Sequence, residues 1–487
     1  MIPLGPWLPD QPDISGPHLI TAENVVPASD HYQPFKAFAI GSAALTTPPV
    51  RGAIAFSDAN ATVHVFAGDE TKLYELQSDT SWLDCTRSVG GAYACSLTSR
   101  WRFTQFGDVA IASNFDDDVQ ARTMSIPGTF ENLAGSPPRA KHVATFKDFY
   151  FYGFTTTSAA ELGWSGINDP TYHTTGSNQC DRQILPDGGD IQGFAPTDAA
   201  LLIFQQTKIR ILQYVGPPVI MQIDPFEEKV GCLESNSIAY HGKKVFWLAP
   251  DGFYQIDSFQ PAVNIGEGIL NEWFLNDVNA SFYYRMSAAV DPQRQLVVWC
   301  YPSQASPSGA PDTQLFYYWP KRRWSYVRTP TELIFNSLGL GYTLEDLDAI
   351  ALTGIDDFAI PLDDPLLRGG ALRFGAFDHD AKYGVFAGAN LEATLEAGDF
   401  ELMKGKRAYV SGVRPVVDSD EVTVSCGFRE RVADPSVYTA DGVLESHGMA
   451  SLEGEGRYGR VKLVIAAGAD WTKAQGYDFD AIPAGDV

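Results

Sequence analysis

The chain has 487 residues, of which 45% are hydrophobic, 12% aromatic and 20% charged, so most of it is expected to fold, in two or three domains. Its 60 Asp and Glu against 35 Lys and Arg give a formal net charge of −25, which disfavours a sequence-reading nucleic-acid binder and attachment to anionic membranes. Frequent Gly (44) and Pro (31), with few long helical patterns, favour an all-β fold of short strands joined by turns.

Residues 1–50 predict an extended N-terminal arm. The stretch LGPWLPDQPDISGPHL, Leu4 to Leu19, is rich in Pro and holds few strand patterns. Pro lacks the N–H that a central strand uses, so we expect the arm to pack through its Pro and Trp side chains. The opening residues show neither a basic nor an apolar signal region, and no window of about 18 apolar residues occurs, so neither a signal peptide nor a membrane span is expected.

A repeated unit begins near residue 51. In each copy an apolar strand of about six residues meets a polar turn, a second apolar strand follows, and often a second turn and a third strand. The copies begin at Gly52, Trp101, Lys141, Ile191, Asn236 and Arg285. These starts lie roughly 40 to 50 residues apart, which is the period of a β-propeller blade, a four-stranded antiparallel sheet.

The fifth copy contains KKVFWLAPDGFYQI, Lys243 to Ile256. Its first apolar run suits a buried strand, and the Pro-Asp-Gly joint suits a tight hairpin turn, because Gly accepts the positive φ that such turns require. An isolated hairpin is at best marginally stable. We therefore expect Phe246 and Trp247 to pack against the blades on either side.

Six copies cover about residues 51–330, and a seventh blade is expected from ALRFGAFDHDAKYGVFAG, residues 371–388, with help from the N-terminal segment. Closure by strands from both ends removes exposed sheet edges. The prediction is a β-propeller of six to seven blades over residues 51–390. A large β-sandwich or several small barrels would also show frequent turns and is the alternative.

Two further regions have residue patterns that differ from the repeated unit. An acidic linker, residues 344–367, contains seven acids and no base. From about Leu391 to the end, apolar and polar residues alternate, as in half-exposed antiparallel strands. Residues 391–487 are therefore expected to form a C-terminal β-rich domain, either a β-sandwich or a barrel.

Six cysteines lie at positions 85, 95, 180, 232, 300 and 426, without a CxxC pair. Cys300 in LVVWCYP and Cys426 in VTVSCGF lie in strand-like contexts, so buried reduced thiols are expected. A bridge between Cys85 and Cys95 is the alternative.

The motif search identifies no catalytic centre, so neither an enzyme nor a cofactor is expected. The sequence lacks GxSxG, a P-loop, sialidase-type boxes and an HxxxH pair for zinc. Asp116, Asp117 and Asp118 are consecutive, which favours an acidic turn over a calcium loop with alternating ligands. WPKRRW, Trp319 to Trp324, could grip a phosphate or stack on a base, but blade packing is the favoured interpretation.

Three segments carry a resemblance to a known family. They are WLPDQPDISGPHLITAENVVPASDHYQPF (Trp7 to Phe35), EATLEAGDFELMKGKRAYVSGVRPVV (392–417) and GRYGRVKLVIAAGADWTKAQGYDFDA (456–481). The chain resembles the tail nozzle or hub proteins of short-tailed phages, also called tail tubular protein B. The resemblance covers most of the chain and includes no active-site signature.

This resemblance implies a β-propeller with added β-domains that assembles as a hexameric ring below the head-to-tail adaptor. Such a ring forms the distal part of the DNA-ejection conduit in the virion tail, after assembly in the host cytoplasm. The implied partners are further copies of the chain, the adaptor and portal-proximal tail proteins, with tail fibres or spikes as further neighbours. DNA passes through without specific binding, and no catalytic residue or cofactor is implied.

The charge suits that role, since acidic walls do not hold a polyanion. The Pro-rich arm is expected to contact the adaptor or a neighbouring subunit, and the acidic linker is expected to form part of the channel wall. The residues expected on that wall are Asp346, Asp348, Asp356, Asp357, Asp363 and Asp364. The alternative function is a receptor- or glycan-binding propeller of a phage tail, which includes a glycan-cleaving form.

Overall fold

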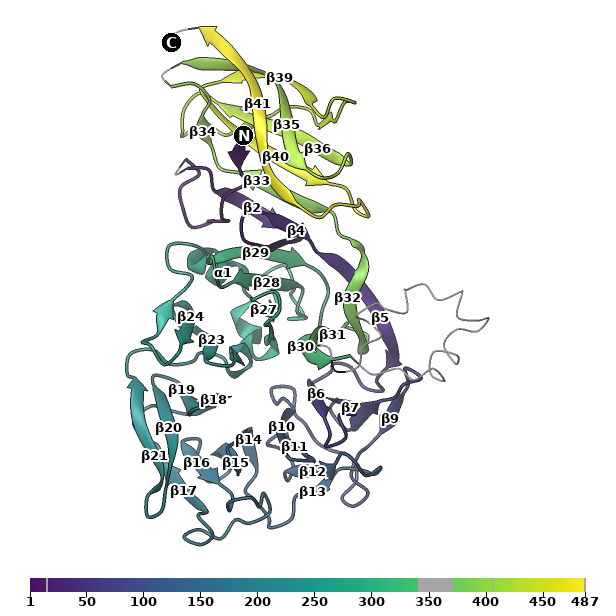
Figure 1. Ribbon diagram of the computed structural model, residues 1–487, viewed down its shortest axis with the longest axis vertical. Helices are drawn as coiled ribbons and strands as arrows, with labels where there is room; N and C mark the ends of the chain where they lie inside the picture. Colours follow the sequence, from purple (N-terminus) through teal and green to yellow (C-terminus); the bar gives the residue numbers. More distant parts are fainter. Residues whose placement is uncertain (15, 340–369, 371, 405, 486–487) are drawn as a thin grey trace.

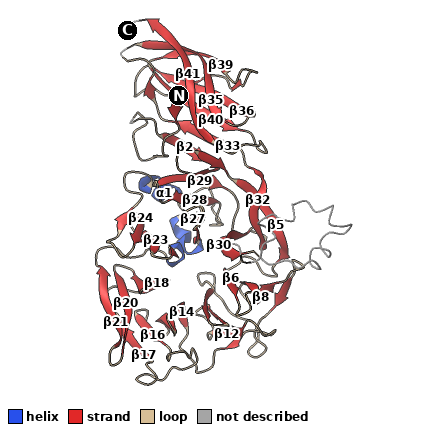
Figure 2. Cartoon of the chain, in the orientation of Figure 1, coloured by secondary structure: helices blue, strands red, loops and turns tan. Residues whose placement is uncertain are grey.

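The computed structural model describes residues 1–14, 16–339, 370, 372–404 and 406–485. A ring of small sheets forms the lower part of Figure 1, and a β-sandwich forms the upper part. Figure 2 shows that strands make up nearly all of the regular structure; the described helices are α1 (Asn271–Asp277) and the 3₁₀ helices η1 (Ser235–Ser237) and η2 (Ala280–Arg285). None of the helices in these ranges has the length and apolar character needed to cross a bilayer.

The ring consists of seven four-stranded antiparallel units, numbered as blades in chain order. Blades 1 to 3 comprise β6 (Gly52–Ser57), β7 (Val63–Gly68), β8 (Leu73–Leu76), β9 (Trp82–Asp84); β10 (Arg102–Phe106), β11 (Val109–Ser113), β12 (Gln120–Thr123), β13 (Glu131–Asn132); and β14 (Ala140–Phe146), β15 (Phe149–Thr155), β16 (Glu161–Trp164), β17 (Asp181–Ile184). Blades 4 to 6 comprise β18 (Ile191–Pro196), β19 (Leu201–Gln205), β20 (Ile209–Gly216), β21 (Ile220–Glu227); β22 (Ala239–His241), β23 (Lys244–Ala249), β24 (Gly252–Asp257), β25 (Val263–Asn264); and β26 (Ser287–Asp291), β27 (Leu296–Tyr301), β28 (Thr313–Tyr318), β29 (Arg323–Arg328). Blade 7 comprises β30 (Leu333–Leu338), β31 (Leu372–Phe377), β32 (Lys382–Asn390) and β5 (Lys36–Ala44).

The first strand of each blade contacts the first strands of both neighbouring blades. These contacts run from β6 through β10, β14, β18, β22, β26 and β30 and back to β6, so the ring is closed. The predicted unit starts lie within three residues of these strands: Gly52 and Ile191 coincide with β6 and β18, and Asn236 precedes β22 by three. The predicted β-propeller is confirmed, with seven blades.

The hairpin of blade 5 packs as its sequence predicts. Ala249 pairs with Gly252 at the turn, and Gly252 has a φ of +136°, which a side chain would strain. Phe246 lies 6.1 Å from Tyr317 of blade 6, between ring centroids, whereas Trp247 lies 5.3 Å from Phe204 of blade 4. Consecutive side chains of β23 therefore face opposite sheets, as the period of a strand requires.

The N-terminal segment closes the ring. β5 pairs antiparallel with β32, with Ala39 opposite Val385 and Phe38 opposite Phe386, and thus becomes the outermost strand of blade 7. Phe35, just before β5, packs on Phe316 of blade 6 at 5.3 Å and on Phe386 at 4.8 Å. The expectation that an N-terminal strand completes the last blade is confirmed.

The C-terminal residues form the two sheets of the sandwich. One sheet contains β3 (Val25–Pro27), β4 (Tyr32–Pro34), β41 (Ala474–Gly485), β35 (Arg407–Val417) and β39 (Ala450–Gly456), with β1 (Ile2–Pro3) on β41. The other contains β2 (Leu19–Glu23), β33 (Ala393–Ala397), β40 (Tyr458–Ile465), β36 (Val422–Arg429) and β37 (Val437–Tyr438), with β34 (Phe400–Glu401) on β40 and β38 (Gly442–Val443) on β36.

The prediction of an extended arm over residues 1–50 is corrected by the strands that residues 1–35 form. These residues supply four strands to the sandwich, and β2 also pairs with β29 of blade 6, with Glu23 opposite Tyr326, so one sheet continues from the propeller into the sandwich. Trp7 has no exposed surface and packs on Trp273 at 4.8 Å and on Tyr326 at 5.0 Å. The segment lies here because it pairs strands of both units whose edges would otherwise be open.

One hydrophobic core spans the junction. The same cluster of buried side chains contains Trp299 and Trp324 of blade 6, Trp7 of the N-terminal segment, and Leu395 and Trp471 of the sandwich. A shared core and a shared sheet leave no solvated linker between the two units. The propeller and the sandwich are therefore fixed to one another.

Candidate functional site

The residues predicted for an acidic wall lie outside the described part of the chain. Asp346, Asp348, Asp356, Asp357, Asp363 and Asp364 all belong to residues 340–369. The channel-wall prediction therefore remains a prediction.

The acidic turn at Asp116–Asp118 is held by hydrogen bonds and ion pairs within the protein. Asp117 is buried and pairs with Arg87 at 2.9 Å. Asp116 accepts the backbone N–H of Ser96 at 2.8 Å, and Asp118 pairs with Arg139 at 2.8 Å. These carboxylates fix the loops of blade 2 to neighbouring segments, which supports a structural role.

WPKRRW packs as part of blade 6. Trp324 has no exposed surface, and the buried Arg323 donates to the backbone carbonyls of Leu4 and Gly5 at 3.1 Å. The Arg323 guanidinium also lies 4.5 Å from the ring centroid of Tyr32, a cation–π contact. The motif therefore fastens the N-terminal segment to the propeller, and its buried Arg and Trp are not available to nucleic acid.

All six cysteines are buried and none of them forms a disulfide, as expected for reduced core thiols. Burial, the largest influence, raises the pKa of Cys85 to about 11 and those of Cys95 and Cys426 to about 12. Thiols held in this protonated state are poor nucleophiles.

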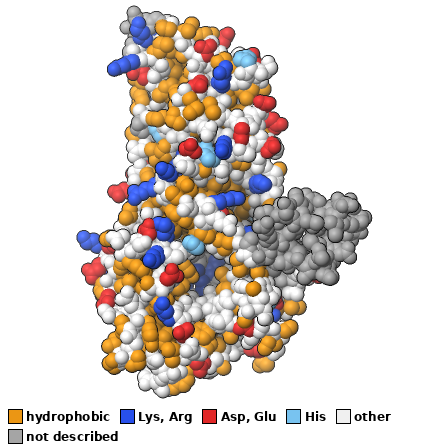
Figure 3. Space-filling view, viewed as in Figure 1, with side chains coloured by type: hydrophobic (Ala, Val, Ile, Leu, Met, Phe, Trp, Pro, Cys, Tyr) orange, Lys and Arg blue, Asp and Glu red, His pale blue; other side chains and the backbone are white. Residues whose placement is uncertain are grey.

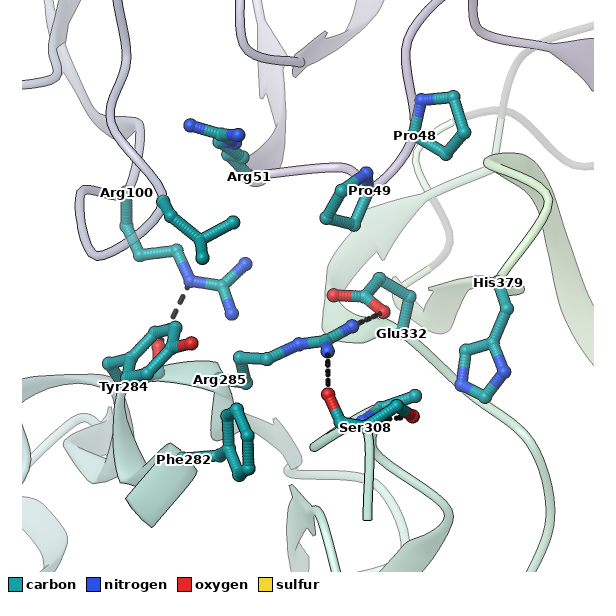
Figure 4. A pocket seen from close by; sticks show the side chains of 12 residues that line it. Pro48, Pro49, Arg51, Arg100, Phe282, Tyr284, Arg285, Ser308, Glu332 and His379 are labelled. Atoms are coloured by element: carbon teal, nitrogen blue, oxygen red, sulfur yellow. Dashed lines mark hydrogen bonds and ion pairs between the residues drawn. The ribbon is translucent and has the colours of Figure 1, made fainter. Parts of the chain in front are cut away.

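A cavity of about 360 Å³ opens where the innermost strands begin. Figure 3 shows a hollow in the face of the propeller, with Lys and Arg side chains at its floor. Figure 4 shows the side chains that line the cavity, among them Arg51, Arg100, Arg285, Tyr284 and Glu332. Each of these residues directly precedes an innermost strand or lies within three residues of one, so the blades position them together.

The cavity contains more cationic than anionic groups. Arg285 pairs with Glu332 and donates to the backbone oxygen of Ser308 at 3.3 Å. Arg100 instead donates to the backbone oxygens of Tyr284 at 3.1 Å and Val50 at 3.2 Å, and it makes no ion pair with the described residues. The carboxylates of Glu332 and Glu234 therefore act on its charge only through space, without a direct contact.

The basic character continues into a smaller hollow that shares Arg100. Arg102 and Lys141 line this hollow with Glu234, and Arg102 donates to the hydroxyl of Ser235 at 2.9 Å and to the side chain of Asn236. Burial, the largest influence, lowers the pKa of Arg102 to about 10 and also lowers those of Arg100 and Lys141. Each shift means that the protein interior disfavours the charged form, which an added anion would favour.

These basic residues were not singled out from the sequence, although a signal was present. Arg51, Arg102, Lys141 and Arg285 all lie at the start of a repeat unit. In a propeller the starts of the innermost strands gather at one end of the axis, so basic residues at this one position of several repeats predict an axial cationic cluster. The net charge of −25 directed attention to acids instead.

Comparisons with known proteins give no family. No protein-family model and no curated protein matches the chain. Among solved structures, one described as the extracellular domain of a hybrid two-component system from B. thetaiotaomicron aligns with a TM-score of 0.42 and 9% identity. The alignment covers 80% of this chain and 43% of that one, so the chain spans less than half the length of its structural neighbour.

Proposed function

We propose that this protein is a structural component of a phage tail, a nozzle or hub that forms part of the DNA-ejection conduit below the head-to-tail adaptor. The observation that supports the proposal best concerns the three segments that resemble this family. Residues 7–35, 392–417 and 456–481 are far apart in the chain, yet all three supply strands to the sandwich. The resemblance thus falls on one structural unit, which shares a sheet with the propeller.

In this role the chain acts through shape and charge rather than chemistry. The shared core makes a stiff two-part body, as a pipe under internal pressure requires. A ring of six copies, each with a net charge of −25, would carry about −150 before counterions bind. DNA would pass through the middle of the ring of subunits. The protein would lie in the tail of the virion after assembly in the host cytoplasm.

The test is assembly. The full-length chain is mixed with the adaptor of the same particle, and the mixture is studied by light scattering and negative-stain imaging. The expected result is a sixfold ring attached below the adaptor. A chain that stays monomeric at high concentration with the adaptor present would contradict the proposal.

The axial cavity favours a second candidate, a receptor- or glycan-binding propeller of a phage tail. Phe282 and Tyr284 line the cavity beside its arginines, and aromatic faces with a few polar groups are typical of ligand pockets. Among the described residues lining it, Glu332 is the single carboxylate, and Arg285 already pairs with it. Glycosidases use two carboxylates, so we propose binding without cleavage. A panel of polysaccharides, assayed for both binding and turnover, separates these roles.

A further inference from the structure

We propose that the axial cavity binds a small hydroxylated anion, a sugar acid or a sugar phosphate. This inference does not depend on the role in a phage tail, because it rests on the lining of one cavity within one chain. Its size of about 360 Å³ lies within the range of small-molecule pockets, at the lower end.

The anionic group is the first requirement, and the arginines impose it. Figure 4 shows the guanidinium groups of Arg100 and Arg285 extending into the middle of the cavity. Arg51 is 4% exposed and lines the same cavity; it pairs with Glu70 at 3.3 Å and donates to the backbone oxygen of Cys95. Within the described structure its Nε has no hydrogen-bond partner, and the same holds for Nε of Arg285. Buried donors of this kind are normally satisfied, and a donor left without a partner destabilises the folded protein. A carboxylate or phosphate, which accepts several hydrogen bonds from guanidinium groups, would satisfy them.

The hydroxyl group is the second requirement, and Glu332 imposes it. This carboxylate is 1% exposed; Arg285 donates to its Oε2, whereas its Oε1 has no partner among the described residues. A carboxylate oxygen can only accept, so the group that approaches it must be a donor. An anion alone would be repelled there, whereas a hydroxyl on the same molecule would fit.

The aromatic side chains give the third requirement, a ring or carbon skeleton. Phe282 and Tyr284 lie on one side of the cavity and Glu332 on the other (Figure 4). An aromatic face packs against the C–H groups of a sugar ring while the polar groups point elsewhere. One molecule with an acidic group, hydroxyl groups and an apolar ring face would therefore match the arginines, Glu332 and the aromatic side chains of the cavity.

The experiment is isothermal titration calorimetry of the full-length chain with D-glucuronate, glucose 6-phosphate, glucose and inorganic phosphate. We expect the two sugar anions to bind, with an affinity that falls as salt is added, and glucose to bind at least tenfold more weakly. If glucuronate alone binds, the ligand is a sugar acid, and if glucose 6-phosphate alone binds, it is a sugar phosphate. Equal binding of glucose and both anions, binding of none, or binding of inorganic phosphate alone would overturn the proposal.

Two substitutions with opposite expected effects guard against a folding artefact. Arg100→Gln removes a cation that makes no described ion pair, so we expect at least a tenfold loss of affinity for the sugar anion that binds. Glu332→Gln keeps an acceptor oxygen but removes the negative charge, so we expect affinity to rise about threefold or more. Arg182→Gln, on a side chain that is 55% exposed on blade 3, is the matched control and should change nothing. Wild-type affinity in Arg100→Gln, or equal losses in both cavity variants, would refute the site.

Discussion

Replacing Asp399 should destabilise the protein more than any other single change in the ion pairs of the sandwich. Asp399 follows β33, has no exposed surface, and accepts two hydrogen bonds from Arg460, at 2.7 Å from Nε and 2.6 Å from a terminal nitrogen. Arg429 also pairs with it. The hydrogen bond from Arg460 to Asp399 is the largest influence that raises the pKa of Arg460. Within the described structure Asp399 is the one carboxylate that pairs with Arg429, whereas Arg460 also pairs with Asp13 at 2.7 Å and with Glu396 at 3.5 Å. The two arginine side chains are 8% and 9% exposed, so Asp399→Asn leaves Arg429 as the buried charge without a partner.

Asp399→Asn keeps the side-chain volume, so the loss is electrostatic and leaves no cavity. Removing one partner of a buried ion pair typically costs about 3–5 kcal/mol, because the remaining charge stays buried without compensation. We expect a loss of that size in the free energy of unfolding, measured by urea titration with circular dichroism and tryptophan fluorescence.

The matched control is Asp13→Asn. Asp13 pairs with the same Arg460 at 2.7 Å, but its side chain is 47% exposed, so water screens the pair. A loss of about 0–1 kcal/mol is expected there. The assignment of Asp399 as the centre of this network is refuted if the free energy of unfolding of Asp399→Asn lies within about 1 kcal/mol of wild type. It is also refuted if the two variants lose equal stability.

Three further predictions concern other parts of the molecule. Trp7→Ala should cost about 3–5 kcal/mol in unfolding free energy, because Trp7 has no exposed surface, whereas Leu83→Ala, at 47% exposed, should stay within about 0.5 kcal/mol; equal effects would contradict the packing of the N-terminal segment. The His64 ring forms a hydrogen bond with the Glu75 carboxylate at 2.6 Å; Asp58 lies 3.6 Å from the same ring, and Arg122 pairs with Glu75. The hydrogen bond to Glu75 is the main cause that raises the pKa of His64 above 6.5. The folded state therefore holds this proton more tightly, so the stabilisation lost in His64→Gln should be largest below pH 6.5 and disappear as pH rises through the folded pKa; a difference that grows with pH would be the wrong sign. Finally, none of the six thiols should react with Ellman's reagent within minutes in the native state, and all six should react in denaturant; rapid native reaction of any thiol would contradict its burial.

The repeat could be predicted from the sequence because the strands of a blade are close together along the chain. Each blade is a meander of consecutive strands, so its hairpins leave a pattern of apolar runs and turns within 40 to 50 residues. The sequence placed β6 and β18 to the residue, and it predicted the two packing faces of Phe246 and Trp247.

The place of the N-terminal segment was not readable, because its pairings are nonlocal. β1 pairs with β41, with Ile2 opposite Tyr477, and β2 pairs with β33, with Leu19 opposite Ala397. The local sequence of a proline-rich stretch with short strands does not indicate a pairing partner more than 350 residues away. Prolines such as Pro3 and Pro27 fall in strands of only two and three residues, which weakens the alternating pattern that identifies longer strands.

The axial site shows a limit of another kind. Whole-chain charge describes the average surface, and here it suggested repulsion of anions, yet the structure gathers Arg51, Arg100, Arg102, Lys141 and Arg285 around one axis. A closed ring brings the same position of each repeat to one end of the axis, so basic residues at that position in four of the seven blades form a concentrated charge. In a propeller, charge is therefore better counted by position within the repeat than over the whole chain.

The path of the chain joins the two units more firmly than a linker would. It begins on the sandwich at β1, crosses to the propeller as β5, completes the seven blades and returns to the sandwich at β33. Blade 7 needs β5 as its fourth strand, and β5 follows directly along the chain from β2, β3 and β4, which lie in the sandwich. Loss of the sandwich would therefore remove support from the strand that closes the ring. A body built in this way transmits force between its parts through paired strands, a property that the proposed role in a DNA conduit would use.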